Sequence, residues 1–366
     1  MSVFARAAPK YPRVPRNLDG LLDRLYDARD DEDEKRKVEA LIRPFLTSQS
    51  VNTVDGNGHP TLGNLAIRSS SLLAVALRLE PDPDTISQSL HYAIRCPRTT
   101  PSSVKALVDA GADVNFNPRI AFTDEEMPEA FSKLHDDSPL SCMFRSAAFK
   151  KDDPAVLEKM GILLQAGAIA DYKGSGEDSH TPLFWSIHNQ DLKAVELLLS
   201  HNADPNQVDW EGYPLVALAA QPNYKERKDG AEHDWFPRDA TSDLILVALL
   251  RRGVDEKHLR STINLPQLPG APPPAQRALL QKVLDGKPAW CEVCSAIRNL
   301  KLCKCVSVAY CGKECQRADW KKHKVVCASS TNAAILTEEK AAFAREGQKK
   351  KKAKAKANKK VAGKKK

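Results

Sequence analysis

The sequence predicts a mainly α-helical protein in which a solenoid of stacked helical hairpins is followed by a small metal-bound domain and a lysine-rich tail. Three observations predict this fold class. A helix–turn–helix pattern recurs over residues 55–255, seven cysteines and one histidine lie within residues 291–327, and residues 348–366 contain 11 lysines and no acidic residue. Stacking is expected because a single hairpin cannot bury its apolar face alone.

Residues 1–54 are predicted to form an N-terminal arm and a helical cap. Apolar residues recur at helical spacing in NLDGLLDRLYDAR and VEALIRPFL, two stretches that lie within residues 17–46. A terminal cap of this kind covers the apolar face of the first repeat of a solenoid.

The repeated unit is clearest in HTPLFWSIHNQDLKAVELLLSHNADPN, residues 180–206. Thr181 is placed to cap the first helix through its hydroxyl, and Pro182 follows at the first helical position, where no N–H is needed. Asn202 stands where a left-handed residue should end the second helix. The stretch therefore predicts two helices joined by a tight turn.

Other copies of this unit are less regular. They occupy residues 59–84, 89–115 and 137–171, and a last copy is split into 212–220 and 242–255. Gly111, Gly167 and Gly253 take the left-handed position of Asn202. The inserts 116–137 and 221–240 lengthen the loops, so about five repeats are expected over residues 55–255.

The "TPL" start and the "NADPN" end of residues 180–206 resemble the ankyrin repeat. The alternative is an unrelated helical array such as HEAT repeats, and the "TPL" and "NADPN" motifs argue against it. The resemblance implies a solenoid whose concave surface binds a protein partner.

A linker is predicted between the repeats and the cysteines, over residues 256–288. It contains the breaker-rich run LPQLPGAPPP (265–274) and a short amphipathic helix in AQRALLQKVLDG (275–286).

Eight candidate metal ligands occur in pairs within the next domain, residues 289–328. The pairs are Cys291/Cys294, Cys303/Cys305, Cys311/Cys315 and His323/Cys327. Four pairs fill two closed tetrahedral sites, which is typical of structural zinc and leaves no open position for catalysis. A domain of about 40 residues has too little core to fold without the ions. The spacing alone leaves open which pairs share an ion.

The order of these ligands closely resembles the MYND-type zinc finger, including the flanking "CQRADW" and "KKH". The resemblance implies that the pairs interleave. The first zinc would then take Cys291, Cys294, Cys311 and Cys315, and the second would take Cys303, Cys305, His323 and Cys327. Cys303 and Cys305 depart from the two-residue spacer usual in the family.

Gln316 and Trp320 are four residues apart and so share one face of the expected helix. As plain structure, Trp320 would fill the small core. In MYND fingers the matching residues line a groove for a proline-containing peptide, so the resemblance implies a peptide-binding role for Gln316 and Trp320.

A non-enzymatic adaptor that binds proteins, including proline-rich segments, is therefore the expected function. SET-domain methyltransferases also carry MYND fingers, but SHNADPN (200–206) matches their N-H-x-x-x-P-N motif in the wrong register, and no phosphate-binding loop or nucleophile elbow is found. Cys96 and Cys142 are expected on repeat helices as buried small side chains.

The lysine tail suggests an alternative function. Its 11 lysines exceed the formal net charge of +8, so the rest of the chain has a net charge of −3. Residues 329–366 are expected to be disordered. The lysines of Lys349–Lys366 could contact the phosphates of RNA, either free or in ribosomes. No apolar run reaches 18 residues, which argues against a membrane span. The expected location is the nucleus, the cytoplasm or both.

Overall fold

The computed structural model describes residues 14–55, 59–118, 138–145, 149–173, 180–209, 212–221, 223–225, 234–236, 240–265, 272–303 and 307–328. The chain divides into two compact units, one ending at Pro273 and the other starting at Pro274. None of the helices in the described ranges is long and apolar enough to cross a lipid bilayer. The predicted disordered tail, 329–366, and most of the insert 116–137 lie outside the described residues.

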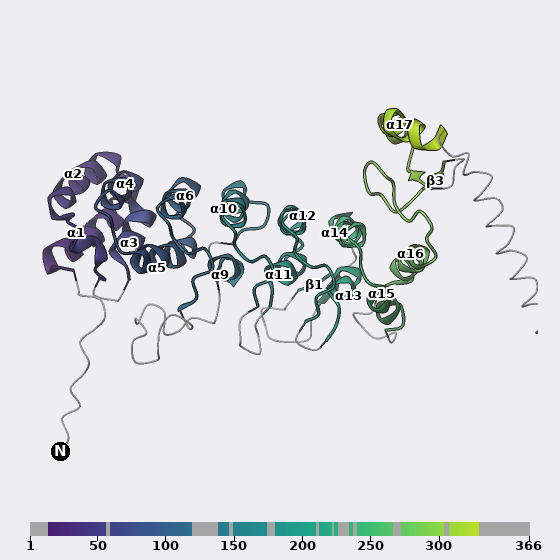
Figure 1. The fold of residues 1–366 in the computed structure, drawn as a ribbon, viewed down its shortest axis with the longest axis horizontal. Helices are drawn as coiled ribbons and strands as arrows, with labels where there is room; N and C mark the ends of the chain where they lie inside the picture. The colour runs from purple at the N-terminus through teal and green to yellow at the C-terminus, as the bar shows by residue number, and fades with distance from the viewer. Residues whose placement is uncertain are drawn as a thin grey trace, which may run out of the picture. The chain divides into compact units, whose positions relative to one another are not determined.

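The first unit begins with two helices that pack against each other, α1 (Arg16–Asp27) and α2 (Glu32–Ile42) (Figure 1). They occupy the stretch for which the sequence predicts a helical cap. Asp31 starts α2, because its Oδ1 accepts the backbone N–H groups of the second and third residues after it, both at 3.0 Å.

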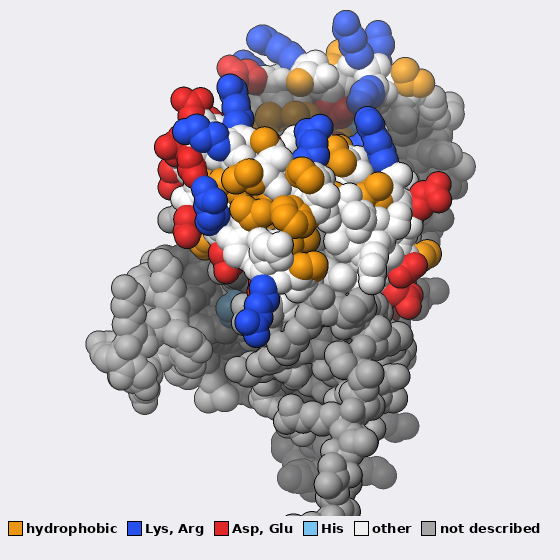
Figure 2. All heavy atoms as spheres, turned by 90° about the vertical axis from the view of Figure 1, so that its left-hand side faces the viewer, with side chains coloured by type: hydrophobic (Ala, Val, Ile, Leu, Met, Phe, Trp, Pro, Cys, Tyr) orange, Lys and Arg blue, Asp and Glu red, His pale blue; other side chains and the backbone are white. Residues whose placement is uncertain are grey.

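The α1–α2 end of the unit carries both signs of charge (Figure 2). Lys, Arg, Asp and Glu side chains there surround an area of hydrophobic side chains. A charged outer face of this kind suits a terminal cap, whose outer side has no further repeat to pack against.

Five helix pairs follow within the described ranges. They are α3 (Thr61–Arg68) with α4 (Ser70–Leu77), α5 (Pro83–Ile94) with α6 (Pro101–Asp109), α9 (Pro139–Arg145) with α10 (Pro154–Gln165), α11 (Pro182–His188) with α12 (Leu192–Ser200), and α13 (Leu215–Ala220) with α14 (Ala240–Arg251). The first helices of successive pairs contact one another, and so do the second helices, which gives two layers (Figure 1). The predicted mainly α fold of stacked hairpins is confirmed.

The ends of the repeat helices have the predicted local chemistry. Thr181 Oγ1 accepts the backbone N–H three residues further on at 3.3 Å and so caps α11. Gly111, Gly167 and Gly253 have φ values of 96°, 93° and 91°, and Asn202 has a φ of 65°. These left-handed residues reverse the chain after the second helix of each pair.

Two asparagines join neighbouring repeats at these turns. Asn115 donates its amide to the carbonyl of Gly167 at 3.1 Å and accepts the N–H two residues beyond that glycine at 2.8 Å. Asn206 repeats the arrangement with the carbonyl of Gly253 at 3.1 Å and the N–H of Asp255 at 2.7 Å. The side chain thus satisfies backbone groups that the turn leaves without helical partners.

Two features of the first unit were not predicted. The insert 221–240 contains an antiparallel pair of strands, β1 (Asn223–Lys225) and β2 (Asp234–Phe236). The beginning of the predicted linker forms α15 (Glu256–Ile263), which buries Leu259 and Thr262 and packs against α13.

The expectation for Cys96 is wrong. It lies in the turn after α5 and is partly exposed, whereas Cys142 on α9 is buried as expected. Cys96 immediately precedes Pro97, and the proline ring disfavours helical backbone at the residue before it.

The second unit contains α16 (Pro274–Leu284), the strands β3 (Lys301–Leu302) and β4 (Ala309–Tyr310), and α17 (Lys313–Ala328). The two strands are antiparallel, with Lys301 opposite Tyr310 and Leu302 opposite Ala309. Residues 304–306, between the strands, lie outside the described residues.

One core position of the repeats holds a lysine. Lys159 on α10 is 1% exposed, and within the described part of the chain it has no ion pair. Burial lowers the pKa of Lys159 because it disfavours the charged amine.

Lys159→Met is therefore expected to raise the free energy of unfolding by about 1 kcal/mol at pH 7, since the thioether needs no hydration. The Lys159 amine binds a proton more readily in the unfolded chain than in the folded one, so the free energy of unfolding of the wild type rises with pH. The difference in favour of Lys159→Met should therefore shrink towards pH 10. Urea unfolding at both pH values measures the difference. The control is Lys105→Met, at an exposed position of α6, and it should change the free energy of unfolding little. A lower free energy of unfolding in Lys159→Met than in the wild type would contradict the prediction.

Candidate metal centre

The finger, residues 289–328, is held together by contacts between the β3–β4 hairpin and α17. Tyr310 on β4 is buried and donates its hydroxyl to Asp319 Oδ2 at 2.7 Å, which ties α17 to the hairpin. The N–H of Glu292 donates to the carbonyl of Ala309 at 3.0 Å, which holds the loop after Cys291 beside β4. These contacts bring three stretches of the chain to one place.

Four cysteines from these stretches form the first cluster. Cys291 and Cys294 lie in the loop, Cys311 follows β4, and Cys315 lies in the first turn of α17. Their four Sγ atoms lie within 4.8 Å of one another, and Cys311 Sγ is 3.5 Å from the Sγ atoms of Cys294 and Cys315. Sulfurs at 2.3 Å from a tetrahedral zinc ion are about 3.8 Å apart, so the cluster fits this ion.

A second cluster contains Cys303, His323 and Cys327. Cys303 Sγ lies 3.3 Å from His323 Nε2 and 4.0 Å from Cys327 Sγ. His323 is 6% exposed and stands one helical turn before Cys327 on α17. Cys305, the predicted fourth member, lies outside the described residues. The structure thus groups the described ligands in the interleaved order that the family resemblance implies, rather than in sequential pairs.

The sulfurs of the first cluster influence one another electrostatically. Burial disfavours the Cys291 thiolate, but backbone N–H groups, including those of Cys294 and Cys311, donate to it and lower the pKa of Cys291 to about 6. The hydrogen bond with the Cys311 side chain, together with burial, raises the pKa of Cys315 to about 12. Four thiolates at these separations repel each other unless a cation lies among them, and a divalent metal ion supplies that charge.

The hydrophobic core of the finger consists largely of these same residues. Cys291, Cys303 and Tyr310 are its buried members, and Cys311, Cys315 and Cys327 are among the partly buried side chains that pack against them. So small a core supplies little folding free energy by itself, which fits a domain stabilised by metal.

Gln316 and Trp320 lie on one side of α17, and both are exposed. Trp320 is 45% exposed, so it does not fill the core as the structural alternative required. Its ring centroid is 6.2 Å from that of His323. A residue of the second cluster therefore lies directly beside the exposed indole.

A row of cations that was not predicted from the sequence adjoins Trp320. Lys313, Arg317, Lys321 and Lys324 recur at intervals of four, four and three residues along α17, which places them on one helix face. All four are exposed, and none forms an ion pair with a described residue. The same spacing is visible in the sequence and could have revealed this basic row.

Two family models match the chain. The MYND finger model matches residues 291–327, and the ankyrin repeat model matches residues 178–210.

Several curated proteins match shorter stretches. Egl nine homolog 1 of Homo sapiens is 46% identical over 66 residues, which are 18% of this chain and 13% of that protein. Palmitoyltransferase ZDHHC13 of Mus musculus is 41% identical over 184 residues, which are 48% of this chain and 24% of that protein. SET domain-containing protein 14 of Caenorhabditis elegans is 49% identical over 45 residues, or 12% and 10%. The chain thus spans a quarter or less of each of these relatives.

Among solved structures, the crystal structure of the ankyrin repeat domain of Bcl-3 is similar with a TM-score of 0.42 and 16% sequence identity. The match covers 67% of this chain and 90% of that one.

The two helix layers, the two sulfur-containing clusters and the two family matches lead to one assignment. The chain contains an ankyrin repeat at residues 178–210, within a stack of helical hairpins, and a MYND finger at residues 291–327, a zinc-binding module that holds two zinc ions; both kinds of domain serve protein–protein interaction.

Proposed function

We propose that the chain is a non-enzymatic adaptor whose finger binds a proline-containing, acidic peptide segment of a partner protein. The observation that carries this proposal is the exposed Trp320, placed on a helix that both clusters anchor and next to the basic row. Zinc would be held by Cys291, Cys294, Cys311 and Cys315 in the first site, and by Cys303, Cys305, His323 and Cys327 in the second. With four protein ligands each, both sites would be closed, so the ions would stabilise the fold and leave no position for a substrate.

The chemistry of this face suits an extended peptide. An indole face offers a large apolar contact for a proline ring, and proline segments lose little conformational entropy on binding. The Gln316 amide can donate to and accept from the backbone of the peptide. The cations of the basic row, which form no ion pair with a described residue, favour acidic residues beside the proline and speed association.

Trp320→Ala is expected to weaken binding of a synthetic P-x-L-x-P peptide with glutamates at its ends by about 30-fold, or about 2 kcal/mol, because a central aromatic contact is lost. Isothermal titration calorimetry on the full chain measures this affinity, and elemental analysis checks that zinc content is retained.

Val325→Ala is the matched control. Val325 is also an exposed apolar residue of α17, 62% exposed, but its position in the helix lies away from the Gln316–Trp320 face. Val325→Ala should bind the peptide like the wild type. Equal affinity in the Trp320 and Val325 variants would refute the peptide-binding role.

The repeat unit would supply a second protein-binding surface. His180, Phe184, Trp185 and His188 form an aromatic cluster at the first helix of the best-matched repeat, with His180 stacked on Phe184 at 3.7 Å. Aromatic side chains are enriched in protein interfaces, which makes this cluster the preferred contact region for a partner.

The alternative function, contact with RNA or ribosomes through Lys349–Lys366, stays a prediction from the sequence, because that segment lies outside the described residues. Location in the nucleus, the cytoplasm or both also stays a prediction from the sequence.

A further inference from the structure

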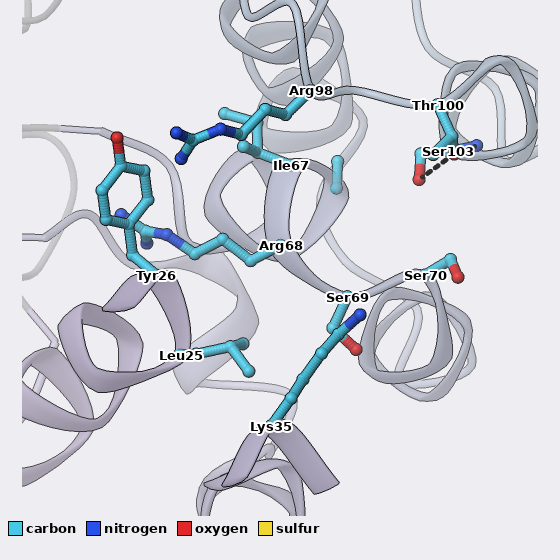
Figure 3. Close-up of a pocket in the computed structure, with 11 residues that line it drawn as sticks. Leu25, Tyr26, Lys35, Ile67, Arg68, Ser69, Ser70, Arg98, Thr100 and Ser103 are labelled. Carbon is cyan, nitrogen blue, oxygen red and sulfur yellow. Dashed lines mark hydrogen bonds between the residues drawn. The ribbon is translucent and has the colours of Figure 1, made fainter. Parts of the chain in front are cut away.

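A cavity of about 230 Å³ lies where the helical cap meets the first two repeats, between α1, α2, α3, α4 and α6 (Figure 3). Its lining includes Tyr26 from α1, Lys35 from α2, Arg68 from α3, and Arg98 from the turn before α6. The cavity belongs to the repeat unit and has no part in the zinc clusters.

The lining is strongly cationic. Lys35, Arg68 and Arg98 contribute three positive charges, and no Asp or Glu is among the residues that line the cavity. Lys35 is paired with Glu32, at 3.3 Å, whereas the two arginines form no ion pair within the described part of the chain. The absence of acidic residues from the lining contrasts with its surroundings, since the first turn of α2 alone contains three acidic residues. Glu39 is nearby but bonds the hydroxyls of Ser69 and Ser71, and it does not line the cavity.

The two arginines are held close to one aromatic ring. The guanidinium carbons of Arg68 and Arg98 lie 5.3 Å and 4.7 Å from the ring centroid of Tyr26. Contact with the ring partly compensates each charge, but two cations on one ring also repel each other. An anion in the cavity would relieve that repulsion.

Hydrogen-bonding capacity remains available on both guanidinium groups. Arg68 donates an Nη1 N–H to Asn64 Oδ1 at 2.6 Å, and its Nη2 makes no hydrogen bond with a described residue. Arg98 makes no hydrogen bond or ion pair within the described part of the chain. Hydroxyl groups of Ser70 and Thr100 also border the space.

We propose that this cavity binds a phosphate monoester. The two arginines, which form no ion pair with a described residue, match a group of charge close to −2 better than a single carboxylate, and their planar guanidinium groups suit phosphate oxygens. The volume exceeds that of a phosphate group, which leaves room for the first atoms of the molecule that carries it. The source is either a phosphorylated side chain of a partner protein or a small phosphorylated metabolite, and the shared chemistry is the monoester dianion.

The test is titration calorimetry of the full chain with phenyl phosphate and with a phosphoserine peptide. Wild-type protein is expected to bind both, and Arg98→Gln is expected to weaken each by about tenfold or more, because charge-assisted hydrogen bonds are lost. Arg98 makes no hydrogen bond or ion pair with a described residue, and the substitution removes only its contact with the Tyr26 ring, so this variant should keep the fold. The control is Arg36→Gln, at an exposed position of α2 outside the cavity. This variant has the same net charge as Arg98→Gln and should bind both probes like the wild type.

Tighter binding of the phosphopeptide than of phenyl phosphate would identify a phosphorylated protein as the source, and equal affinities would identify a small phosphate. Either result supports the site if Arg98→Gln weakens binding. The proposal is overturned if wild-type protein binds neither probe, or if Arg98→Gln and Arg36→Gln bind equally. Binding of the unphosphorylated peptide with the same affinity would also exclude phosphate recognition.

Discussion

Cys291→Ser is expected to reduce the zinc content from two ions per chain to about one or fewer, and to unfold the finger. Cys291 is fully buried, and its sulfur belongs to both the first cluster and the small hydrophobic core. Structural zinc contributes about 10–16 kcal/mol in zinc-finger peptides, far more than so small a core can supply. Elemental analysis measures the ions, and protease resistance of residues 289–328 reports the loss of structure.

Cys96→Ser is the matched control, because Cys96 is a thiol of the repeat unit outside both clusters. It should keep two zinc ions and a protease-resistant finger. Two ions retained in Cys291→Ser would refute the assignment of the first site. Cys305→Ser tests the fourth ligand of the second site separately: a content near one ion would place Cys305 there, and two ions would exclude it.

Asp55→Ala is expected to lower the free energy of unfolding of the repeat unit by about 3 kcal/mol. The Asp55 carboxylate accepts the backbone N–H of His59 at 2.8 Å, its Nδ1 at 3.0 Å, and the amide of Asn64 at 3.0 Å. Asn64 is fully buried, so the substitution leaves its amide donor without this acceptor in a place that water does not reach. The midpoint of urea unfolding, followed by circular dichroism, measures the loss.

Asp109→Ala provides the comparison. Asp109 pairs with Lys105 four residues earlier on exposed α6, at 2.9 Å. Exposed pairs of this kind contribute less than about 0.5 kcal/mol, so this variant should unfold close to the wild type. Equal effects of the two substitutions would contradict the role given to Asp55.

The contribution of Asp55 also depends on pH. Burial disfavours its carboxylate, but hydrogen bonds from His59 and Asn64 outweigh burial and lower the pKa of Asp55 below its usual 3.8. A carboxyl group whose pKa is lowered by folding stabilises the protein above its unfolded pKa and loses this effect as the pH falls below it. The difference between the wild type and Asp55→Ala should therefore narrow below pH 3.8.

Local patterns in the sequence determined the repeats and the set of candidate ligands. Thr181 caps α11 and Gly111, Gly167 and Gly253 reverse the chain because these roles depend on a few adjacent residues. The paired spacing of cysteines likewise predicts metal binding without knowledge of the fold, since neighbouring ligands reach one ion within a turn.

Only the tertiary structure decided which distant residues meet. Spacing left open whether the ligand pairs are sequential or interleaved, and the β3–β4 hairpin packed on α17 brings Cys291 and Cys294 to Cys311 and Cys315. The helix α15 was missed because its burial depends on α13, which lies some 40 residues earlier in the chain.

The cationic cavity could not be predicted for the same reason. Tyr26, Lys35, Arg68 and Arg98 come from four separate segments, and none belongs to a motif. Periodicity reports which face of a helix is apolar, but it does not report which polar side chains from other helices are brought against one another when the hairpins stack. The sequence by itself determined the repeating helices and the candidate metal ligands, and stacking of the hairpins decided where three cations share one cavity.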